Sequence, residues 1–457
     1  MPERKPGLMQ RTIRPEQVLA VGFLLVILAG TALLALPFAT VERRSLGLFD
    51  SLFTATSAVC VTGLVAVDTG TTLSMFGQAV LLVLIQLGGL GFMIFATLVM
   101  LALGRRITLR DRMLIRESVN ASTLSGLLRL TIWYGLITLI IEGTGAVLLA
   151  IRMVPAYGWP RGIWLAVFHA VSAFCNAGFD LFGSFSSLTG FAEDPLVLLT
   201  VSMLIILGGL GFSVMLEVVR GKRQGWRGLS LHTKVVLVVT AGLLVTGTVF
   251  YALVEWNNPA TLAKDNANAA LRLLNAFFQS VTMRTAGFNS VDLAAMKDSS
   301  KLMSVILMFI GASPASTGGG VKTTTVSVLL LIVLSVIRGQ EHVNVFGKRL
   351  PQGLMRRALS ILFIYLVILL GCTMVLTLAE QDGYPFIDLL FESASALATV
   401  GVSTVGTPNL SFISRLVLIP VMYFGRVGPL TLALALANKQ NNTQNRLRYP
   451  EESMMIG

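Results

Sequence analysis

Long runs of apolar residues recur along the whole chain and limit it to folds that cross a membrane. A membrane-spanning helix needs about 20 mostly apolar residues. Seven stretches meet this requirement, and an eighth is long but interrupted. Their approximate ranges are 17–37, 78–104, 127–151, 196–219, 233–254, 302–337 (the interrupted one), 358–379 and 411–437. We therefore predict an all-α membrane protein with eight transmembrane helices.

Charged residues are too few for a soluble protein. They make up 13% of the 457 residues, whereas hydrophobic residues make up 54%. Soluble domains carry about 25% charged residues, so that class is excluded, and the apolar content excludes a disordered chain. The three cysteines and three histidines form no cluster in the sequence. The pattern predicts neither a disulfide framework nor a zinc site.

The charges that are present divide between the two sides of the membrane. With eight spans both termini lie on one side, and most Lys and Arg residues fall on that side. The positive-inside rule then places both termini in the cytoplasm of a multi-pass cell-membrane protein. The net charge of +12 therefore marks topology and not a nucleic-acid partner. The opposite face is net acidic, which either concentrates cations there or is merely solvated.

An internal fourfold repeat is the strongest pattern in the chain. We predict a cytoplasmic arm (1–14), one membrane domain (15–437) and a cytoplasmic tail (438–457). The repeats span about residues 15–104, 124–220, 232–338 and 353–437. Each contains a semi-polar segment that leads to a glycine: Gly63, Gly178, Gly287 and Gly401. A phenylalanine stands ten residues before each one: Phe53, Phe168, Phe277 and Phe391. Another glycine follows about 25 residues later: Gly88, Gly208, Gly311 and Gly425.

The segment before each repeated glycine is predicted to be a short re-entrant helix. About 12 residues cannot cross a membrane, so the chain must enter and return, with its loop buried in protein or facing water. Four re-entrant pore loops around a pseudo-fourfold axis bring backbone carbonyls together, and such a ring can replace the hydration shell of a monovalent cation. Glycine suits the turn because it reaches positive φ. The alternative is a set of tight turns between packed helices.

The candidate ion-binding residues are the four glycines and the two residues before each of them. They are Val61, Thr62 and Gly63; Asn176, Ala177 and Gly178; Thr285, Ala286 and Gly287; and Thr399, Val400 and Gly401. The last three are also the core of the potassium-channel filter signature. On these residues the chain resembles the Trk/Ktr/HKT superfamily of potassium transporters over about 15–437. Within it, the chain is similar to the membrane subunits of bacterial Ktr systems, the KtrB type.

The resemblance implies a function and partners that composition and spacing do not. It implies potassium uptake through four membrane-pore-membrane repeats, with the four glycines in the selectivity filter and potassium at the filter carbonyls. It also implies sodium dependence, a homodimer, and a cytoplasmic nucleotide-binding regulatory ring of the RCK type, similar to KtrA. In plant relatives a serine at the first filter position accompanies sodium preference, so Gly63 favours potassium. The chain itself is expected to hold no cofactor.

Residues 311–322 interrupt the apolar stretch 302–337 and are predicted to form a gate. Small residues and three consecutive glycines make this segment easy to move, and it has no nucleotide P-loop spacing. The resemblance likewise implies an intramembrane gating loop beneath the filter; the alternative is a kinked helix with no role. The candidate gate residues are Gly311, Ala312, Ser313, Pro314, Gly318, Gly319, Gly320, Lys322 and Arg426.

Three other polar residues lie in apolar surroundings. A charge such as Arg426 inside a span is costly, so we expect it either to form a positive gate or to pair with Glu217 or Glu142. Arg284, close to the third glycine, is expected to pair with Glu392 behind the filter. His169 is expected to be a packing or hydrogen-bonding residue.

Two other classes of function remain to be weighed. A secondary transporter or symporter with a midplane site usually shows two repeats and often uses intramembrane carboxylates. Here there are four repeats, and Glu142 is the only acid well inside a span. An enzyme is not expected, because the sequence offers no paired carboxylates, His cluster or nucleophile–base set.

Overall fold

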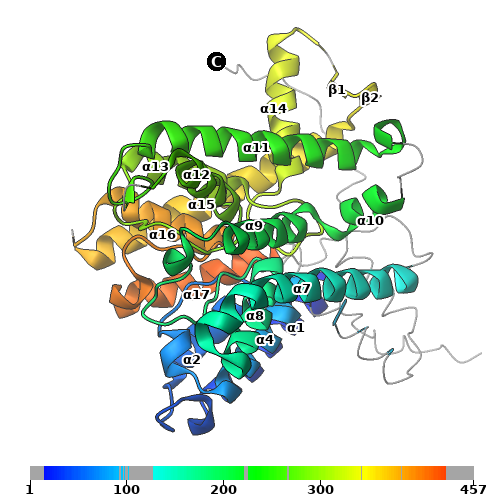
Figure 1. Cartoon of the computed structure of the whole chain (residues 1–457). Coiled ribbons are helices and arrows are strands. Elements are labelled where there is room, and N and C mark those ends of the chain that lie inside the picture. Colours follow the sequence, from blue (N-terminus) through cyan, green and yellow to red (C-terminus); the bar gives the residue numbers. More distant parts are fainter. Residues whose placement is uncertain are drawn as a thin grey trace, which may run out of the picture.

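The computed structural model describes residues 15–91, 94–95, 97, 101, 127–220, 225–264, 267–340, 342–381 and 383–428. Helices dominate this part of the chain, which confirms the predicted all-α class. Strands occur in it only as a small antiparallel hairpin, formed by β1 (Asn344–Val345) and β2 (Lys348–Arg349). Figure 1 shows this hairpin beside α14 (Thr323–Ile337), which projects from the main body of the molecule.

The described helices follow one order four times, and we call each occurrence a unit. A unit has a first helix, a short helix, a loop and a second helix. The first helices are α1 (Pro15–Leu34), α7 (Leu127–Tyr157), α11 (Leu231–Glu255) and α15 (Gln352–Glu380). The short helices are α2 (Leu48–Val59), α8 (Trp159–Phe174), α12 (Ala269–Thr282) and α16 (Phe386–Ala398). The second helices are α4 (Met75–Leu90), α9 (Pro195–Leu210), α13 (Asp298–Ile310) and α17 (Phe412–Val427).

Smaller elements lie between these helices. They are the turns η1 (Pro37–Ala39), η2 (Thr189–Phe191), η4 (Gly225–Gly228) and η6 (Thr407–Asn409) and the helices α3 (Thr69–Thr72) and α10 (Phe212–Arg220).

The four first helices are long and apolar enough to cross a membrane. Large apolar side chains on them are exposed, including Leu24, Leu139, Leu253 and Leu370. Exposing this much apolar surface to water is unfavourable in free energy, whereas exposing it to lipid is not. Each of these helices coincides with a predicted span. The predicted spans 78–104 and 411–437 continue beyond the described residues, and the total of eight stays a prediction.

In each of the four units, the second helix ends at a glycine with positive φ. These glycines are Gly91 (+80°), Gly211 (+93°), Gly311 (+64°) and Gly428 (+90°). The predicted span 196–219 is therefore wrong as one continuous helix, because α9 and α10 meet at Gly211 at an angle of 99°. The predicted interruption at 311–322 is present between α13 and α14. Gly311 thus ends a helix and corresponds to Gly91, Gly211 and Gly428, whereas the spacing in the sequence paired it with Gly88.

The four units pack into a closed ring. Each second helix contacts the short helix of the next unit: α4 packs on α8, α9 on α12, α13 on α16, and α17 on α2 of the first unit. Figure 1 shows the consequence, because α17, late in the chain, lies against the region of α1 and α2. The ring brings the loops that follow the four short helices toward one centre.

Two carboxylates, the buried Glu255 and the half-buried Glu380, link helices within the third and fourth units in the same way. Glu255, the last residue of α11, accepts hydrogen bonds from the Lys297 backbone N–H (2.9 Å) and the Ser300 hydroxyl (2.6 Å) at the start of α13. Glu380, the last residue of α15, accepts bonds from Ser411 N–H (3.0 Å) and the Ser414 hydroxyl at the start of α17. Each carboxylate thus satisfies donors at a helix N-terminus.

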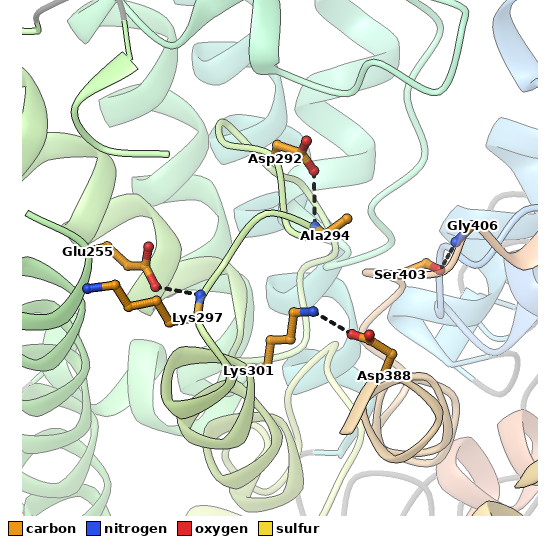
Figure 2. Close-up of polar contacts among 8 residues, drawn as sticks. All are labelled: Glu255, Asp292, Ala294, Lys297, Lys301, Asp388, Ser403 and Gly406. Atoms are coloured by element: carbon orange, nitrogen blue, oxygen red, sulfur yellow. Dashed lines mark hydrogen bonds and ion pairs between the residues drawn. The ribbon is translucent and has the colours of Figure 1, made fainter. Parts of the chain in front are cut away.

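An ion pair fastens the third unit to the fourth. Lys301 Nζ of α13 lies 2.8 Å from Asp388 Oδ1 in the first turn of α16, and the two side chains are only 8% and 10% exposed. Figure 2 shows the two side chains pointing toward each other between the helices. Removing one partner of a buried pair leaves an unpaired charge, which costs about 3–5 kcal/mol.

We expect Asp388→Ala to lower the thermal unfolding midpoint of the detergent-purified protein by several degrees, because Lys301 stays buried without its partner. The double variant Lys301→Met with Asp388→Leu is expected to recover most of the loss. Asp50→Ala breaks the more exposed Arg415–Asp50 pair (3.5 Å) and serves as the control, with little effect expected. Equal midpoints for Asp388→Ala and Asp50→Ala would contradict a stabilising role for the buried pair.

Candidate functional site

The four repeated glycines meet at the centre of the ring, in loops with the same backbone conformation. We call residues 61–63, 176–178, 285–287 and 399–401 the glycine loops. Their glycines have positive φ: Gly63 +90°, Gly178 +68°, Gly287 +89° and Gly401 +98°. The residue two before each glycine is left-handed as well: Val61 +55°, Asn176 +58°, Thr285 +72° and Thr399 +53°. Four non-glycine residues in this rare region show that one unusual turn is repeated.

Each glycine touches the backbone of the next loop, and these contacts close a circle. A Cβ added to Gly63 would collide with the carbonyl oxygen of Ala177. The same holds for Gly178 with Ala286, for Gly287 with Val400, and for Gly401 with Thr62 of the first loop. Only glycine fits, since both its φ and its lack of a side chain are required. All twelve predicted ion-binding residues lie in these loops.

A hydroxyl group from the end of each short helix fixes its loop. Ser57 Oγ accepts a bond from Gly63 N–H (3.0 Å), and Ser395 Oγ accepts one from Gly401 N–H (3.0 Å). In the other two units, the hydroxyl donates to the carbonyl after the glycine: Ser172 to Phe179 (2.8 Å) and Thr282 to Phe288 (2.6 Å). These hydroxyls were not among the residues predicted for the site.

The third loop is one residue shorter than the others. Its fixing residue, Thr282, stands five residues before its glycine, whereas the serines of the other units stand six before theirs. The phenylalanine four residues before Thr282 is Phe278, which is fully buried like Phe53, Phe168 and Phe391. The predicted equivalent, Phe277, is only half-buried. Matching by distance from the glycine therefore selected the wrong member of the Phe277–Phe278 pair.

A cavity of about 400 Å³ lies on one side of the glycine loops, and all four glycines line it. Asp180 and Asp292 also line it, in the stretches that follow the second and third glycines. Burial raises the pKa of Asp180 to about 7; the Phe182 backbone N–H opposes this rise and Asp68 adds to it. These two carboxylates were not among the residues predicted for the site, although both closely follow a repeated glycine. We call this cavity the mouth.

The 311–322 segment covers the other side of the loops. Gly318 packs so closely on the Thr285 hydroxyl, and Gly319 on the Thr399 hydroxyl, that a Cβ at either would collide. The Thr317 hydroxyl donates to the carbonyl of Phe174 at the end of α8 (3.1 Å). Its backbone N–H donates to Gly208 (3.2 Å). The segment thus contacts the second, third and fourth units directly beneath their glycine loops.

Two half-buried cations hold this segment in place. Lys322 Nζ donates to the carbonyls of Gly318 (2.6 Å) and Gly319 (3.4 Å). Arg426 of α17 donates to the carbonyl of Thr317 and to those of Gly88 and Gly89 at the end of α4.

The predicted carboxylate partners of Arg426 are wrong among the described residues. Glu142 accepts bonds from Gln86 (3.1 Å), and Glu217 accepts them from Ser230 and Thr233. Arg426 forms no ion pair there, and its guanidinium is satisfied by backbone carbonyls instead.

Arg284 and His169 also have partners that can be compared with prediction. Arg284 does not pair with Glu392: it donates to the Thr240 hydroxyl (3.4 Å), and Glu392 accepts a bond from Thr407 (2.6 Å). His169 is fully buried, stacks on Phe182 with ring centroids 4.2 Å apart, and bonds to Leu165 O (2.7 Å). The packing role predicted for His169 is confirmed.

Among the described residues no group of three or more His, Cys, Asp or Glu could hold a metal ion.

Sequence comparison decides the family. The profile of the TrkH family, described as "Cation transport protein", matches residues 4–446. The chain belongs to this family. It is 40% identical to "Ktr system potassium uptake protein B" of Bacillus subtilis over 97% of both chains. It is 39% identical to "Potassium/sodium uptake protein NtpJ" of Enterococcus hirae over 98% of both.

A solved structure shows the same fold. The potassium transporter TrkH from Vibrio parahaemolyticus superposes with a TM-score of 0.71 at 19% identity, over 95% of this chain and 87% of that one. The predicted resemblance to the Trk/Ktr group is confirmed by these matches. This member of the TrkH family is therefore a membrane protein of a cation-transport family and not an enzyme.

We expect Arg426→Ala to speed cation flux through the purified protein in liposomes by about tenfold. Charge-assisted hydrogen bonds contribute about 1.5–3 kcal/mol each, and their loss frees the 311–322 segment from α4. Arg415→Ala, on the same helix but paired with Asp50 at the surface, is the control and should leave flux unchanged. Slower flux from correctly folded Arg426→Ala protein would show that the arginine does not hold a barrier.

Proposed function

We propose that this chain forms the pore of a potassium-uptake system, with the glycine loops as its selectivity filter. The observation that carries the proposal is the closed circle of contacts between each glycine and the next loop. Such a circle requires four loops around one axis. It supports the architecture of four membrane-pore-membrane repeats with eight spans, since each unit supplies one loop.

The loops have the chemistry that a dehydrated cation needs. The N–H groups of Thr62, Ala177, Ala286 and Val400 bond back to the ends of their own short helices, at 2.8–3.0 Å. Their carbonyls gather around the centre of the ring, each against the glycine of a neighbouring loop. A ring of carbonyl oxygens can replace the water around a monovalent cation. The membrane potential, about 2.3 kcal/mol per charge at 100 mV, then drives inward flow.

Potassium is the proposed substrate because of the loops and the relatives together. Glycine occupies the critical position in all four loops. Two similar proteins are named as potassium uptake and potassium/sodium uptake proteins, which also supports sodium dependence. The acidic mouth, with Asp180 and Asp292, favours cations over anions.

The 311–322 segment is proposed to be the gate. It lies beneath the glycine loops. Lys322 and Arg426 hold it by hydrogen bonds to its own backbone carbonyls, which in a regular helix would accept bonds from backbone N–H groups. Opening requires these bonds to break and the segment to leave the axis. Deleting Ala312–Thr317 is expected to raise flux if the segment obstructs the path.

The assembly is proposed from family membership. The named Ktr relative belongs to a "system", which supports a separate regulatory subunit. We propose a homodimer in the cell membrane, with both termini in the cytoplasm and bound to an RCK-type nucleotide-binding ring. The exposed apolar faces of the first helices supply the surface for lipid and for the second subunit.

The filter assignment is tested by Gly178→Ser. Gly178 has φ of +68°, and a Cβ there would meet the Ala286 carbonyl and Gly287. The neighbouring carbonyls must shift, so we expect the preference for potassium over sodium to fall about tenfold, a change of about 1.4 kcal/mol. Potassium and sodium uptake into liposomes measures this preference. Gly371→Ser on α15, where nothing lies within 4 Å of the added Cβ, is the control. An unchanged preference in Gly178→Ser would reject the filter.

The mouth is tested by the pH dependence of uptake. Because the pKa of Asp180 is raised to about 7, this carboxyl loses its negative charge between external pH 8 and pH 6. One charge about 6 Å from a cation in water is worth about 0.7 kcal/mol, so we expect roughly threefold slower rubidium uptake at pH 6 at low salt. Asp180→Asn should be slow at both pH values, whereas Asp298→Asn should behave as wild type. The same pH dependence in Asp180→Asn would exclude this carboxyl as its source.

A further inference from the structure

The residue that follows the buried phenylalanine of each short helix is polar, and we call this place the support position. It holds a different residue type in each unit, and none of the four is more than 1% exposed: Thr54, His169, Gln279 and Glu392. A buried polar group is unfavourable unless it is hydrogen-bonded, whereas an apolar side chain would fill the same space without that penalty. Four polar residues at one repeated place therefore indicate that the position does more than fill the core.

In the fourth unit, the support position is bonded to the wall of the mouth. Glu392 Oε1 accepts a hydrogen bond from the Thr407 hydroxyl (2.6 Å), and both residues are buried. Thr407 stands six residues after Gly401, and residues 402–404 and 406–409 line the mouth. Glu392 is not among the residues that line this cavity, so its carboxylate acts from behind the loop. The bond joins α16 to the chain that leads away from the fourth glycine loop.

This bond links the mouth loop, residues 402–409, to the rest of the molecule. The other bonds of the loop are internal: Gly406 N–H donates to Ser403 Oγ (2.9 Å), which Figure 2 shows, and Asn409 Nδ2 donates to Val405 O (3.1 Å). In the described part of the chain, no residue outside 402–410 other than Glu392 is hydrogen-bonded to the mouth loop. A loop with one such anchor gains freedom to move when the anchor is removed.

Glu392 and Ser395 hold two points of the same stretch of chain. Ser395 Oγ accepts the Gly401 N–H (3.0 Å) at the glycine loop, and Glu392 holds Thr407 at the mouth. Both side chains come from one helix, α16, so the distance between the two points is set by a rigid element. Sites that select between similar ions need this kind of support, because small displacements of the ligand atoms change which ion fits.

The second unit repeats this arrangement with a different residue type. His169 Nε2 accepts a hydrogen bond from the Leu181 N–H (3.4 Å). Leu181 stands three residues after Gly178 and next to Asp180, which lines the mouth. His169 Nδ1 lies 2.7 Å from Leu165 O; a carbonyl only accepts, so Nδ1 carries the proton and Nε2 is left as the acceptor. The support position of this unit thus also holds the chain that follows its glycine.

The other two support positions make weaker contacts. Gln279 Nε2 lies 3.7 Å from Met296 Sδ, in the chain that follows the third glycine. The Thr54 hydroxyl of the first unit has no hydrogen-bond partner among the described residues. The fourth unit shows the arrangement most clearly, because its bond is short and joins two buried groups.

We propose that Glu392 is a positioning residue for cation selection, which holds the mouth loop through the Thr407 hydroxyl and so steadies the fourth glycine loop. This role rests on the proposed function and adds to it a residue that contacts no ion. When the bond is lost, the mouth loop shifts, and the fourth glycine loop no longer keeps one spacing for the preferred cation. The hydrogen bond carries the effect, and the charge of the carboxylate is not required for it.

Thr407→Val is the decisive variant, because valine keeps the shape of threonine and loses only the hydroxyl. Glu392→Leu removes the acceptor from the other side, and Glu392→Gln restores it with an amide oxygen and without the charge. The matched control is Thr138→Val: this buried hydroxyl on α7 has no partner among the described residues. Glu255→Leu is the control for stability, since it removes a buried carboxylate that links α11 to α13 and does not line the mouth.

The measurement is rubidium uptake into liposomes with sodium as competitor, analysed for the apparent KM and the maximal rate. We expect Thr407→Val and Glu392→Leu each to lower the preference for rubidium over sodium about fivefold, as the loss of one hydrogen bond implies. The loss should appear in KM, and the double variant should lower the preference no further, because both changes remove the same bond. Glu392→Gln and Thr138→Val should match wild type. Glu255→Leu should lower the thermal unfolding midpoint and leave the preference unchanged.

Several results would overturn the role of Glu392. An unchanged preference in Thr407→Val would show that the bond does not matter, and equal losses in Glu392→Gln and Glu392→Leu would assign the effect to the charge. An equal loss in Glu255→Leu would assign it to weaker folding, and losses that multiply in the double variant would show that Glu392 and Thr407 act separately. The proposed function fails by a different result, the absence of rubidium uptake by wild-type protein, and the role of Glu392 falls with it.

Discussion

Each repeated glycine touches a carbonyl of the next glycine loop, and this contact limits how the four units can pack. It joins backbone to backbone, so no side-chain adjustment can relieve a misfit. Because Gly401 of the fourth unit meets Thr62 of the first, the ring closes only when α17 packs on α2. The hydroxyls of Ser57, Ser172, Thr282 and Ser395 hold the loops at the radius where these contacts form.

The broken helix and the half-buried cations Lys322 and Arg426 depend on each other. A charge away from water needs partners, and in the described residues neither Lys322 nor Arg426 has a carboxylate in ion-pair contact. The carbonyls of Thr317, Gly318 and Gly319 are free to accept their bonds because the chain there is not helical. In return, the cations satisfy irregular backbone that lipid could not.

Several features of the fold could be predicted from sequence. The apolar runs located the four first helices, and the spacing of the repeated glycines located the four loops. The small residues and three consecutive glycines of 311–322 located the break. The bend at Gly211 was missed, although Gly208-Gly209-Leu210-Gly211 repeats Gly88-Gly89-Leu90-Gly91 and both final glycines have positive φ. Counting back from glycines also failed at Phe277, since a fixed offset cannot register the single residue that the third loop lacks.

The class of protein, the number of units and the residues that must be glycine follow from the sequence, because hydrophobic length and conformational freedom are local properties. The partners of the charged side chains depend on how distant segments pack. Arg426 meets Gly88 and Thr317, which lie 338 and 109 residues away, and Arg284 meets Thr240 and not Glu392. Any residue type can supply a backbone carbonyl, so the sequence carries no sign of which one a buried cation will meet.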